Sequence, residues 1–228
     1  LAKTDSRARV VVTAGDTAVQ SVGRMIRTPG ARRTFAIATV VFCATLAAMP
    51  ANARKNVVAT IAQIGEPLTT IAAGKANIIM LMGEGVDPHL YRLTRSDVAK
   101  LNRADLILYN GLHLEAQMLG MMERFARRKP VVAIADTLAD RNLLTWAGKT
   151  HDPHVWMDPQ LWSRALAAAV DALAAVDTPN APFYRANAGR YFAKLSSLDR
   201  RARAAVKTIP AHRRALVTAH DAFGYFGR

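Results

Sequence analysis

Short apolar runs rich in Val, Ile and Leu alternate with helix-like stretches through most of this chain. Four runs have this character: Val57–Ala62, Asn77–Met82, Asp105–Tyr109 and Val131–Ala135. Apolar runs without polar alternation are typical of strands that are buried on both faces. Because helical segments separate these runs, the sequence predicts βαβ units around a parallel sheet, and hence an α/β fold.

Two helices are indicated between the apolar runs. Thr94, with Asp97 three residues later, matches a capping box and predicts a helix that runs to Ala104. Leu112–Arg127 carries apolar residues at helical spacing. Each helix would carry the chain back to the start of the next parallel strand.

The last third of the chain is also predicted to be mainly helical. An alanine-rich helix is expected from Gln160 to about Val176, and the turn residues Asp177–Pro179 would end it. A second helix, from Ala181 to about Lys207, would be roughly 40 Å long at 1.5 Å per residue. Pro210 would end this long helix, and Ala215–His220 has the composition of a further strand.

The first 53 residues resemble an export leader. Arg32 and Arg33 precede the apolar run Phe35–Ala48, and the small residues at Ala51–Ala53 suit a signal peptidase. The apolar run is shorter than the roughly 20 residues that span a bilayer, which argues against a transmembrane anchor. We therefore expect a signal peptide and a periplasmic mature protein that begins at Arg54.

Details of this leader bear on export and anchoring. Met25 is the expected translation start, because a signal peptide normally begins within a few residues of its basic region. Cys43 follows the bulky Phe42, whereas a lipoprotein signal has a small residue there, so no lipid anchor is expected. Arg32-Arg33-x-Phe35 also resembles a twin-arginine signal, which leaves the export route open. The mature chain would contain no cysteine, which excludes thiolate ligands and disulfides.

The formal net charge of +14 on 228 residues does not by itself indicate a nucleic-acid partner. Lys and Arg are interleaved with Asp and Glu, and no basic run carries the aromatic residues that nucleic-acid binders use. With 51% hydrophobic and 21% charged residues, the composition is that of a globular chain. We expect a solvated basic surface and no nucleic-acid partner.

The tripeptide Asp-Pro-His occurs twice, in "VDPHLY" (Val86–Tyr91) and in "HDPHVW" (His151–Trp156). Proline restricts its own φ and the preceding residue, so His89 and His154 would stand on stiff turns. Both, together with His220, are expected at carboxyl ends of strands, where open parallel sheets bind ligands. Three imidazoles would supply most of the coordination shell of a divalent transition metal. Spacing alone does not show that they meet, and turn formation explains a single Asp-Pro-His equally well.

Four sequence blocks, taken in their order along the chain, resemble those of a known protein family: "GVDPHLY", "ADLILYNGLHLE", "DPHVWMDP" and "VTAHDAFGYFGR". Together they resemble the metal-binding solute receptors of ABC transporters, of the ZnuA, TroA and PsaA type, over Val57–Arg228. The resemblance implies two α/β lobes joined by one long rigid helix, with the metal in the cleft between them. It also implies that His89, His154 and His220 are metal ligands, and that a carboxylate from the second lobe is the fourth.

The same resemblance implies a domain organisation and partners. Residues 54–178 would form the amino-terminal lobe, residues 179–208 the linker helix, and residues 209–228 the start of a second lobe that is mostly missing from this sequence. We expect a monomer that binds zinc or manganese and delivers it to the permease and ATPase subunits of an ABC importer.

The remaining histidines are not expected to be ligands. His113 lies in a family block but outside the ligand set, so it would support the cleft wall. His151 is expected in a loop, because Pro153 breaks the helical spacing of an HxxH pair. His212 lies in an arginine-rich stretch and would be exposed.

Acidic and aromatic side chains near the ligands are candidates for supporting roles. Metal-bound imidazoles usually donate their second N–H to a carboxylate or a carbonyl. Four aspartates are candidates to accept it: Asp87, Asp152, Asp158 and Asp221. Turn capping explains each aspartate equally well. Three aromatic residues would exclude water from the cleft or simply pack in the core: Tyr91, Trp156 and Phe223.

The sequence leaves more than one possibility for the bound metal and for the functional class of the protein. Three nitrogens and one carboxylate suit Zn²⁺, whereas Mn²⁺ and Fe²⁺ prefer more oxygen ligands. The block "AHDAFGYFGR" resembles that of receptors which bind either zinc or manganese, so the sequence does not decide between the two metals. A metal-dependent hydrolase is one alternative function, although no HExxH, GxSxG or phosphate-binding glycine motif lies near the histidines. An adhesin-like surface receptor is the other.

Overall fold

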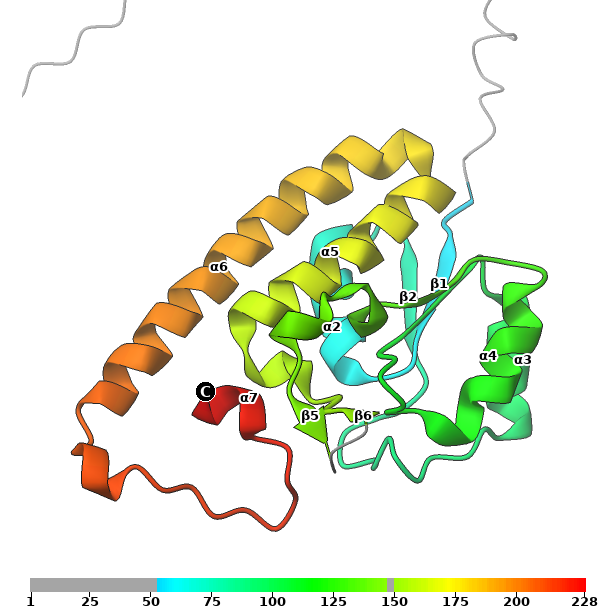
Figure 1. Cartoon of the computed structure of the whole chain (residues 1–228). Helices are drawn as coiled ribbons and strands as arrows, with labels where there is room; N and C mark the ends of the chain where they lie inside the picture. The colour runs from blue at the N-terminus through cyan, green and yellow to red at the C-terminus, as the bar shows by residue number, and fades with distance from the viewer. Residues whose placement is uncertain (1–52, 147–149) are drawn as a thin grey trace, which may run out of the picture. The chain divides into compact units, whose positions relative to one another are not determined.

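Four parallel strands form the central sheet of this protein (Figure 1). The computed structural model describes residues 53–146 and 150–228, so the expected leader, apart from Ala53, lies outside the described residues. The strands lie in the order β2-β1-β3-β4. Their bounds are Asn56–Ala59 for β1, Asn77–Met80 for β2, Leu106–Tyr109 for β3 and Val131–Ala133 for β4. The predicted α/β fold with a parallel sheet is confirmed.

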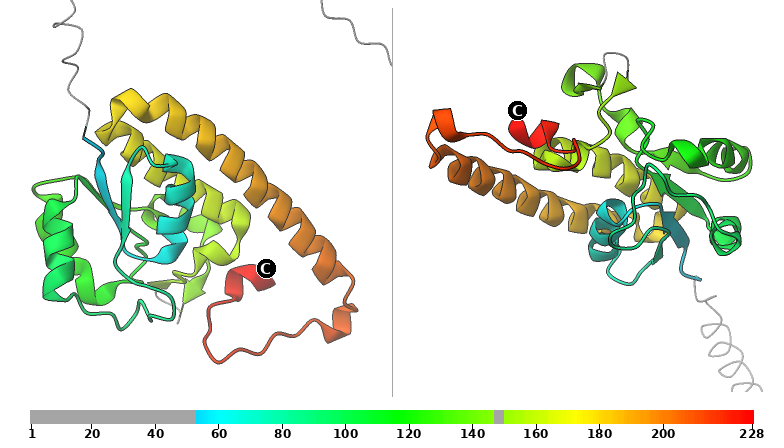
Figure 2. Two further views of the ribbon diagram at one scale, coloured as in Figure 1. Left: turned by 180° about the vertical axis from the view of Figure 1, so that it is seen from behind. Right: turned by 90° about the horizontal axis from the view of Figure 1, so that it is seen from below.

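Helices cover both faces of the sheet. Their bounds are Ala62–Ala72 for α2, Arg95–Arg103 for α3, Leu119–Ala126 for α4, Pro159–Val176 for α5, Ala181–Lys207 for α6 and Gly224–Gly227 for α7. Helices α2, α5 and α6 pack together on one face, and α3 and α4 lie on the other (Figures 1 and 2).

Shorter elements connect the helices and strands. A two-strand antiparallel hairpin, β5 (Thr145–Trp146) with β6 (Thr150–His151), lies outside the main sheet. Single turns of 3-10 helix occur at Ala116–Met118, Ala135–Thr137, Asp140–Asn142, Val155–Met157, Thr178–Asn180 and Ala211–Arg213. The hairpin and the turn at Val155–Met157 flank the second Asp-Pro-His sequence.

Burial of the strands follows their place in the sheet. Val57 and Val58 in β1, and Leu106 and Ile107 in β3, are 0% exposed, because these central strands have helices on both faces. Strands β2 and β4 are the sheet edges, and Met80 at the end of β2 is 42% exposed. The expectation of strands buried on both faces therefore holds for the central pair only.

The strand order creates a switch point. The chain leaves β1 to form β2 on one side and leaves β3 to form β4 on the other side. The carboxyl ends of β1 and β3 therefore border a crevice, which is where open α/β sheets bind ligands.

Several predicted boundaries are wrong. Strands β2 and β4 each end two residues before the expected Met82 and Ala135. Ala62 was expected in a strand, but it begins α2. Ile64 in the first turn of α2 is 0% exposed, like Val57 and Val58 in β1, and an apolar run does not distinguish a strand from the start of a buried helix. The helix expected from Leu112 begins only at Leu119, after a 3-10 turn. Leu112 and His113 have φ values of 50° and 62°, in the left-handed region that a right-handed helix excludes.

A buried carboxylate closes the corner between α5 and α6. Asp177 is 3% exposed and accepts hydrogen bonds from the Tyr184 hydroxyl at 2.5 Å and from the Asn180 side-chain amide at 2.9 Å. Tyr184 is 0% exposed. The turn residues that were expected to end α5 therefore also fix the direction in which α6 leaves.

The long helix predicted from Ala181 is confirmed as α6, which runs without a break (Figure 1). Only its first part is buried, through Ala181, Tyr184 and Ala188, whereas Leu198 is 44% exposed. None of the helices in residues 53–146 and 150–228 combines the length and apolar character needed to cross a bilayer.

The chain after α6 turns back toward the sheet and ends in α7 (Figure 1). The strand expected over Ala215–His220 is not formed. This stretch is exposed, and among the described residues no strand lies beside it, so its backbone lacks the ladder partners that define a strand. Contact resumes at Ala222 and Tyr225, which are 6% and 3% exposed.

The capping box predicted at Thr94 is present at the start of α3. The Thr94 hydroxyl oxygen accepts from the Asp97 amide, and Asp97 Oδ2 accepts from the Thr94 amide. Asp97 also accepts from the Tyr91 hydroxyl at 2.7 Å and from Lys100 at 3.0 Å. Burial raises the pKa of Tyr91 to about 12, together with its bond to Asp97. The loop that carries His89 is therefore fastened to α3.

Replacing Tyr184 by Phe should lower the free energy of unfolding by about 1–3 kcal/mol, because the substitution leaves a buried carboxylate short of one donor. Urea unfolding followed by circular dichroism measures the change. Tyr191→Phe is the matched control on the same helix, since the half-buried Tyr191 makes no side-chain hydrogen bond among the described residues. Equal midpoints for the Tyr184 variant and the parent chain would contradict this prediction.

The contribution of Asp97, at the start of α3, to the free energy of unfolding should depend on pH. Burial alone would raise the pKa of Asp97, but hydrogen bonds from Thr94, Tyr91 and Lys100 lower it well below its ordinary 3.8. Because folding lowers this pKa, the contribution of Asp97 to the free energy of unfolding is fully present above pH 3.8. The contribution is lost as the pH falls from 3.8 through the pKa of Asp97 in the folded protein. Asp97→Asn should therefore cost about 2 kcal/mol at pH 7 and less at pH 3, as measured by urea unfolding. A difference that stays constant between the two pH values would refute the assignment.

Candidate metal centre

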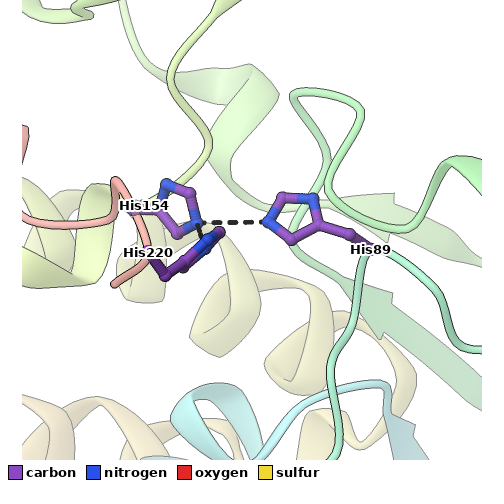
Figure 3. A group of neighbouring side chains, drawn as sticks. All are labelled: His89, His154 and His220. Carbon is purple, nitrogen blue, oxygen red and sulfur yellow. Dashed lines mark hydrogen bonds between the residues drawn. The ribbon is translucent and has the colours of Figure 1, made fainter. Parts of the chain in front are cut away.

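Three histidines from distant parts of the chain meet at one point (Figure 3). His89 comes from the loop after β2, His154 from the turn after β6, and His220 from the stretch before α7. The Nε2 atom of His154 lies 3.2 Å from Nε2 of His89 and 3.1 Å from Nε2 of His220. One ring nitrogen of each residue lies within 4.8 Å of the others. These are the three histidines that the sequence singled out as candidate ligands.

The spacing of the nitrogens suits a shared metal ion. A tetrahedral ion with metal–nitrogen bonds of about 2.0–2.1 Å holds its ligand nitrogens about 3.3 Å apart. The two Nε2–Nε2 distances at His154 come close to this value. Among the described residues, no other group of three or more His, Cys, Asp or Glu side chains has comparable spacing.

The two Asp-Pro-His sequences form the same local turn. Asp87 Oδ1 accepts a hydrogen bond from the His89 amide at 2.8 Å, and Asp152 Oδ1 accepts one from the His154 amide at 2.9 Å. In each turn the carboxylate fixes the backbone of the histidine two residues later. The repeated motif thus holds two imidazoles on short, stiff loops.

Only one of the two carboxylates also reaches the imidazole. Asp152 Oδ1 lies 2.7 Å from His154 Nδ1, and both residues are buried, at 6% and 2% exposure. A carboxylate can only accept, so this bond places a proton on Nδ1 of His154. In the neutral ring Nε2 then carries the lone pair, and it faces His89 and His220. Asp87, by contrast, is exposed and bonds the backbone.

The other two aspartates have different surroundings. Asp158 caps α5, with Oδ1 accepting from the amides of Gln160 and Leu161, and Oδ2 lies 3.2 Å from the Arg228 guanidinium. The capping explanation therefore accounts for Asp158. Asp221 is exposed beside His220.

Aromatic rings surround His154 on two sides. The Trp156 ring centroid lies 5.2 Å from that of His154, and the Trp146 centroid lies 5.4 Å away. Tyr91 instead uses its hydroxyl on Asp97, and Phe223 is 37% exposed. Trp146 was missed by the sequence reasoning, because it lies in a polar, turn-rich segment without periodicity. Burial lowers the pKa of His89, and the neighbouring His154 lowers it further.

The other histidines lie apart from this cluster. His113 and His151 line a separate pocket of about 260 Å³ together with Gly111, Leu112, Leu119, Asp136 and Thr150. His151 Nε2 lies 3.7 Å from Asp140 Oδ1. His212 is exposed in the 3-10 turn after α6. The triad borders a different and larger cleft of about 1070 Å³, which also includes Glu66 and Met82.

A buried polar network supports the His154 turn from the switch point. Glu115, which is 1% exposed, accepts hydrogen bonds from the Thr60 hydroxyl at 2.7 Å and from the Asn110 amide at 2.8 Å. The Asn110 side-chain amide in turn donates to the Pro153 carbonyl at 3.1 Å, next to His154. Burial raises the pKa of Glu115, and the bonds it accepts from Asn110 and Thr60 oppose that rise.

The sequence reasoning missed this network. Its only signal was a polar residue near the end of each central run, Thr60 within Val57–Ala62 and Asn110 directly after Asp105–Tyr109. Such residues at strand ends are common in turns, so position alone does not distinguish them.

The sequence was compared with known proteins. Residues 57–228 match the family model "ZnuA: Zinc-uptake complex component A periplasmic". The zinc-binding protein TroA of Treponema pallidum is 41% identical over 178 residues, covering 78% of this chain and 58% of that protein. The manganese-binding lipoprotein MntA of Bacillus subtilis is 37% identical over 195 residues, covering 85% of this chain and 64% of that protein.

A third relative and a solved structure agree with these matches. The manganese ABC transporter substrate-binding lipoprotein PsaA of Streptococcus pneumoniae is 31% identical over 184 residues, covering 76% of this chain and 58% of that protein. The structure of the periplasmic TroA protein superposes with a TM-score of 0.74 at 41% identity, covering 76% of this chain and 62% of that one. The chain thus spans about three fifths of the length of these relatives. Because the family model extends over residues 57–228, this chain belongs to the ZnuA family.

Proposed function

We propose that this protein binds one divalent transition-metal ion through His89, His154 and His220, as the receptor of an ABC importer. The observation that carries the proposal is the convergence of three ring nitrogens within 4.8 Å. Neutral imidazoles bind divalent metals through the lone pair, and Asp152 leaves that lone pair of His154 facing the cluster.

The chemistry of the donor set favours zinc, with manganese as the other cargo. Three nitrogens suit a four-coordinate Zn²⁺ site, and a carboxylate or water oxygen would complete it. Manganese prefers more oxygen ligands than the triad offers. Among the relatives, TroA is named a zinc-binding protein and MntA a manganese-binding one, so titration of this chain with both ions is the direct comparison.

The proposed partners are the permease and the ATPase of the importer, and the proposed place of action is outside the cytoplasmic membrane. The family description includes the word periplasmic, and PsaA is named a substrate-binding lipoprotein of a manganese ABC transporter. Several relatives are lipoproteins by name, so the expectation of no lipid anchor gains no support from them. The relatives' names describe binding and transport rather than catalysis, which supports a receptor over a hydrolase.

Replacing His89, His154 or His220 singly by Ala should weaken Zn²⁺ binding by more than about 100-fold. Substituting a residue that only orients a metal ligand already lowers the metal affinity by about 10- to 100-fold, and removal of the ligand itself should lower it further. Isothermal titration calorimetry measures the dissociation constants. The control variants His151→Ala and His212→Ala remove imidazoles outside the triad and should bind like the parent chain. Equal losses in all five variants, or none in the triad variants, would remove the basis of the proposal.

The two Asp-Pro-His turns provide a matched pair of substitutions. Asp152→Asn should weaken Zn²⁺ binding by about 10-fold, because it removes the charge that orients the His154 ring. Asp87→Asn should change it little, since Asp87 bonds the backbone and an asparagine oxygen can still accept that bond. Fluorescence of Trp146 and Trp156, which flank His154, reports binding during titration. Equal effects of the two substitutions would contradict the distinction drawn here.

A further inference from the structure

We propose that Tyr225 is a positioning residue, which fastens the segment carrying His220 to the turn that carries His154. The inference rests on the metal-binding function proposed above and assigns it a further residue. It starts from the exposure of the chain around His220. Residues 207–221 are all exposed, and burial resumes only at Ala222 and Tyr225. Among the described residues, the buried contacts nearest to His220 along the chain are therefore those of Ala222 and Tyr225.

The Tyr225 hydroxyl makes two hydrogen bonds to the neighbourhood of His154. It donates to the Asp152 carbonyl at 2.7 Å and accepts from the Leu144 amide at 3.1 Å. Asp152 and Leu144 are themselves joined, since the Asp152 amide donates to the Leu144 carbonyl at 2.8 Å. These residues flank the β5–β6 hairpin. The hydroxyl thus closes a small ring of backbone groups at the base of the Asp-Pro-His turn.

Gly224 and Arg228, on either side of Tyr225, also contact residues around the His154 turn. A Cβ atom on Gly224 would lie 3.1 Å from Asp152 Oδ2 and 3.1 Å from Leu144 Cδ1, so the backbone of Gly224 packs closely against the turn and a side chain there would require a small shift of these neighbours. The Arg228 guanidinium lies 5.5 Å from the Tyr225 ring centroid, donates to the Asn142 carbonyl at 2.9 Å, and lies 3.2 Å from Asp158 Oδ2.

Asp152 then serves both sides of the cluster. Its carboxylate holds the His154 amide and Nδ1, while its carbonyl holds the tyrosine that stands five residues after His220. Docking of Tyr225 therefore brings the third imidazole to two that are already fixed on the first part of the fold. Without this contact His220 would belong to an exposed segment, and binding the ion would have to order that segment first.

Tyr225→Phe tests the inference, because it keeps the buried ring and removes only the hydroxyl. The Zn²⁺ dissociation constant of the 228-residue chain should rise about 10-fold. Tyr184→Phe is the matched control, because it removes a buried tyrosine hydroxyl from a carboxylate at the α5–α6 corner. The control should lower stability and leave the dissociation constant unchanged. Similar affinity losses in both variants would show a general effect of stability and overturn the proposal.

A double-substitution cycle separates positioning of His220 from a direct effect on His154. In a His220→Ala background, Tyr225→Phe should weaken binding by less than about twofold, because the imidazole that it positions is gone. If the tenfold loss persists in that background, Tyr225 acts through the His154 turn alone and the proposal is wrong. If Tyr225→Phe does not fold, Gly224→Ala replaces it in the single-substitution comparison with Tyr184→Phe only, because its methyl group would lie against the Asp152 carboxylate and so act on the His154 turn in either background; an unchanged dissociation constant in Gly224→Ala would count against the proposal.

The results also separate this inference from the proposed function. If the triad variants lose Zn²⁺ affinity and Tyr225→Phe does not, the metal centre stands and the positioning role falls. If the parent chain itself does not bind Zn²⁺ or Mn²⁺ in calorimetry, both fall together.

Discussion

The Asp152 carboxylate on the His154 ring is the interaction on which the candidate metal centre depends. It fixes the proton on Nδ1, and so directs the Nε2 lone pair toward the other two imidazoles. Both residues are almost fully buried, so the carboxylate acts with little screening by water. Asn110 supports this pair through the Pro153 carbonyl, and Tyr225 connects the segment of His220 to it.

The fold supplies a rigid base for this pair. Strands β1 and β3 lie at the centre of the sheet and are buried at three of their four residues each, and the polar residues directly after them, Thr60 and Asn110, share the carboxylate of Glu115. A buried carboxylate is costly unless donors surround it, and these donors come from the switch point itself. Asn110 extends the network to the Pro153 carbonyl. The site is therefore built against the most deeply buried strands of the sheet.

The two sides of the triad are held in different ways. His89 and His154 stand on Asp-Pro turns fastened to the sheet and to α3, whereas His220 follows an exposed stretch after α6. Helix α6 is buried only near its start, where Tyr184 and Asp177 fix its direction. The third nitrogen therefore stands on a segment that docks through Tyr225 on the carbonyl of Asp152, the residue that also orients His154.

The sequence by itself determined the features that depend on near neighbours in the chain. The parallel α/β plan, the capping box at Thr94, the long helix α6 and the stiff turns at His89 and His154 follow from apolar periodicity and from proline, and the family resemblance read from four blocks is confirmed. Tertiary structure alone decided which groups meet. It distinguished Asp152 from Asp87, placed Trp146 beside His154, and left Ala215–His220 without strand partners. Spacing along a chain restricts only local geometry, whereas contacts between distant residues depend on how the helices pack against the sheet.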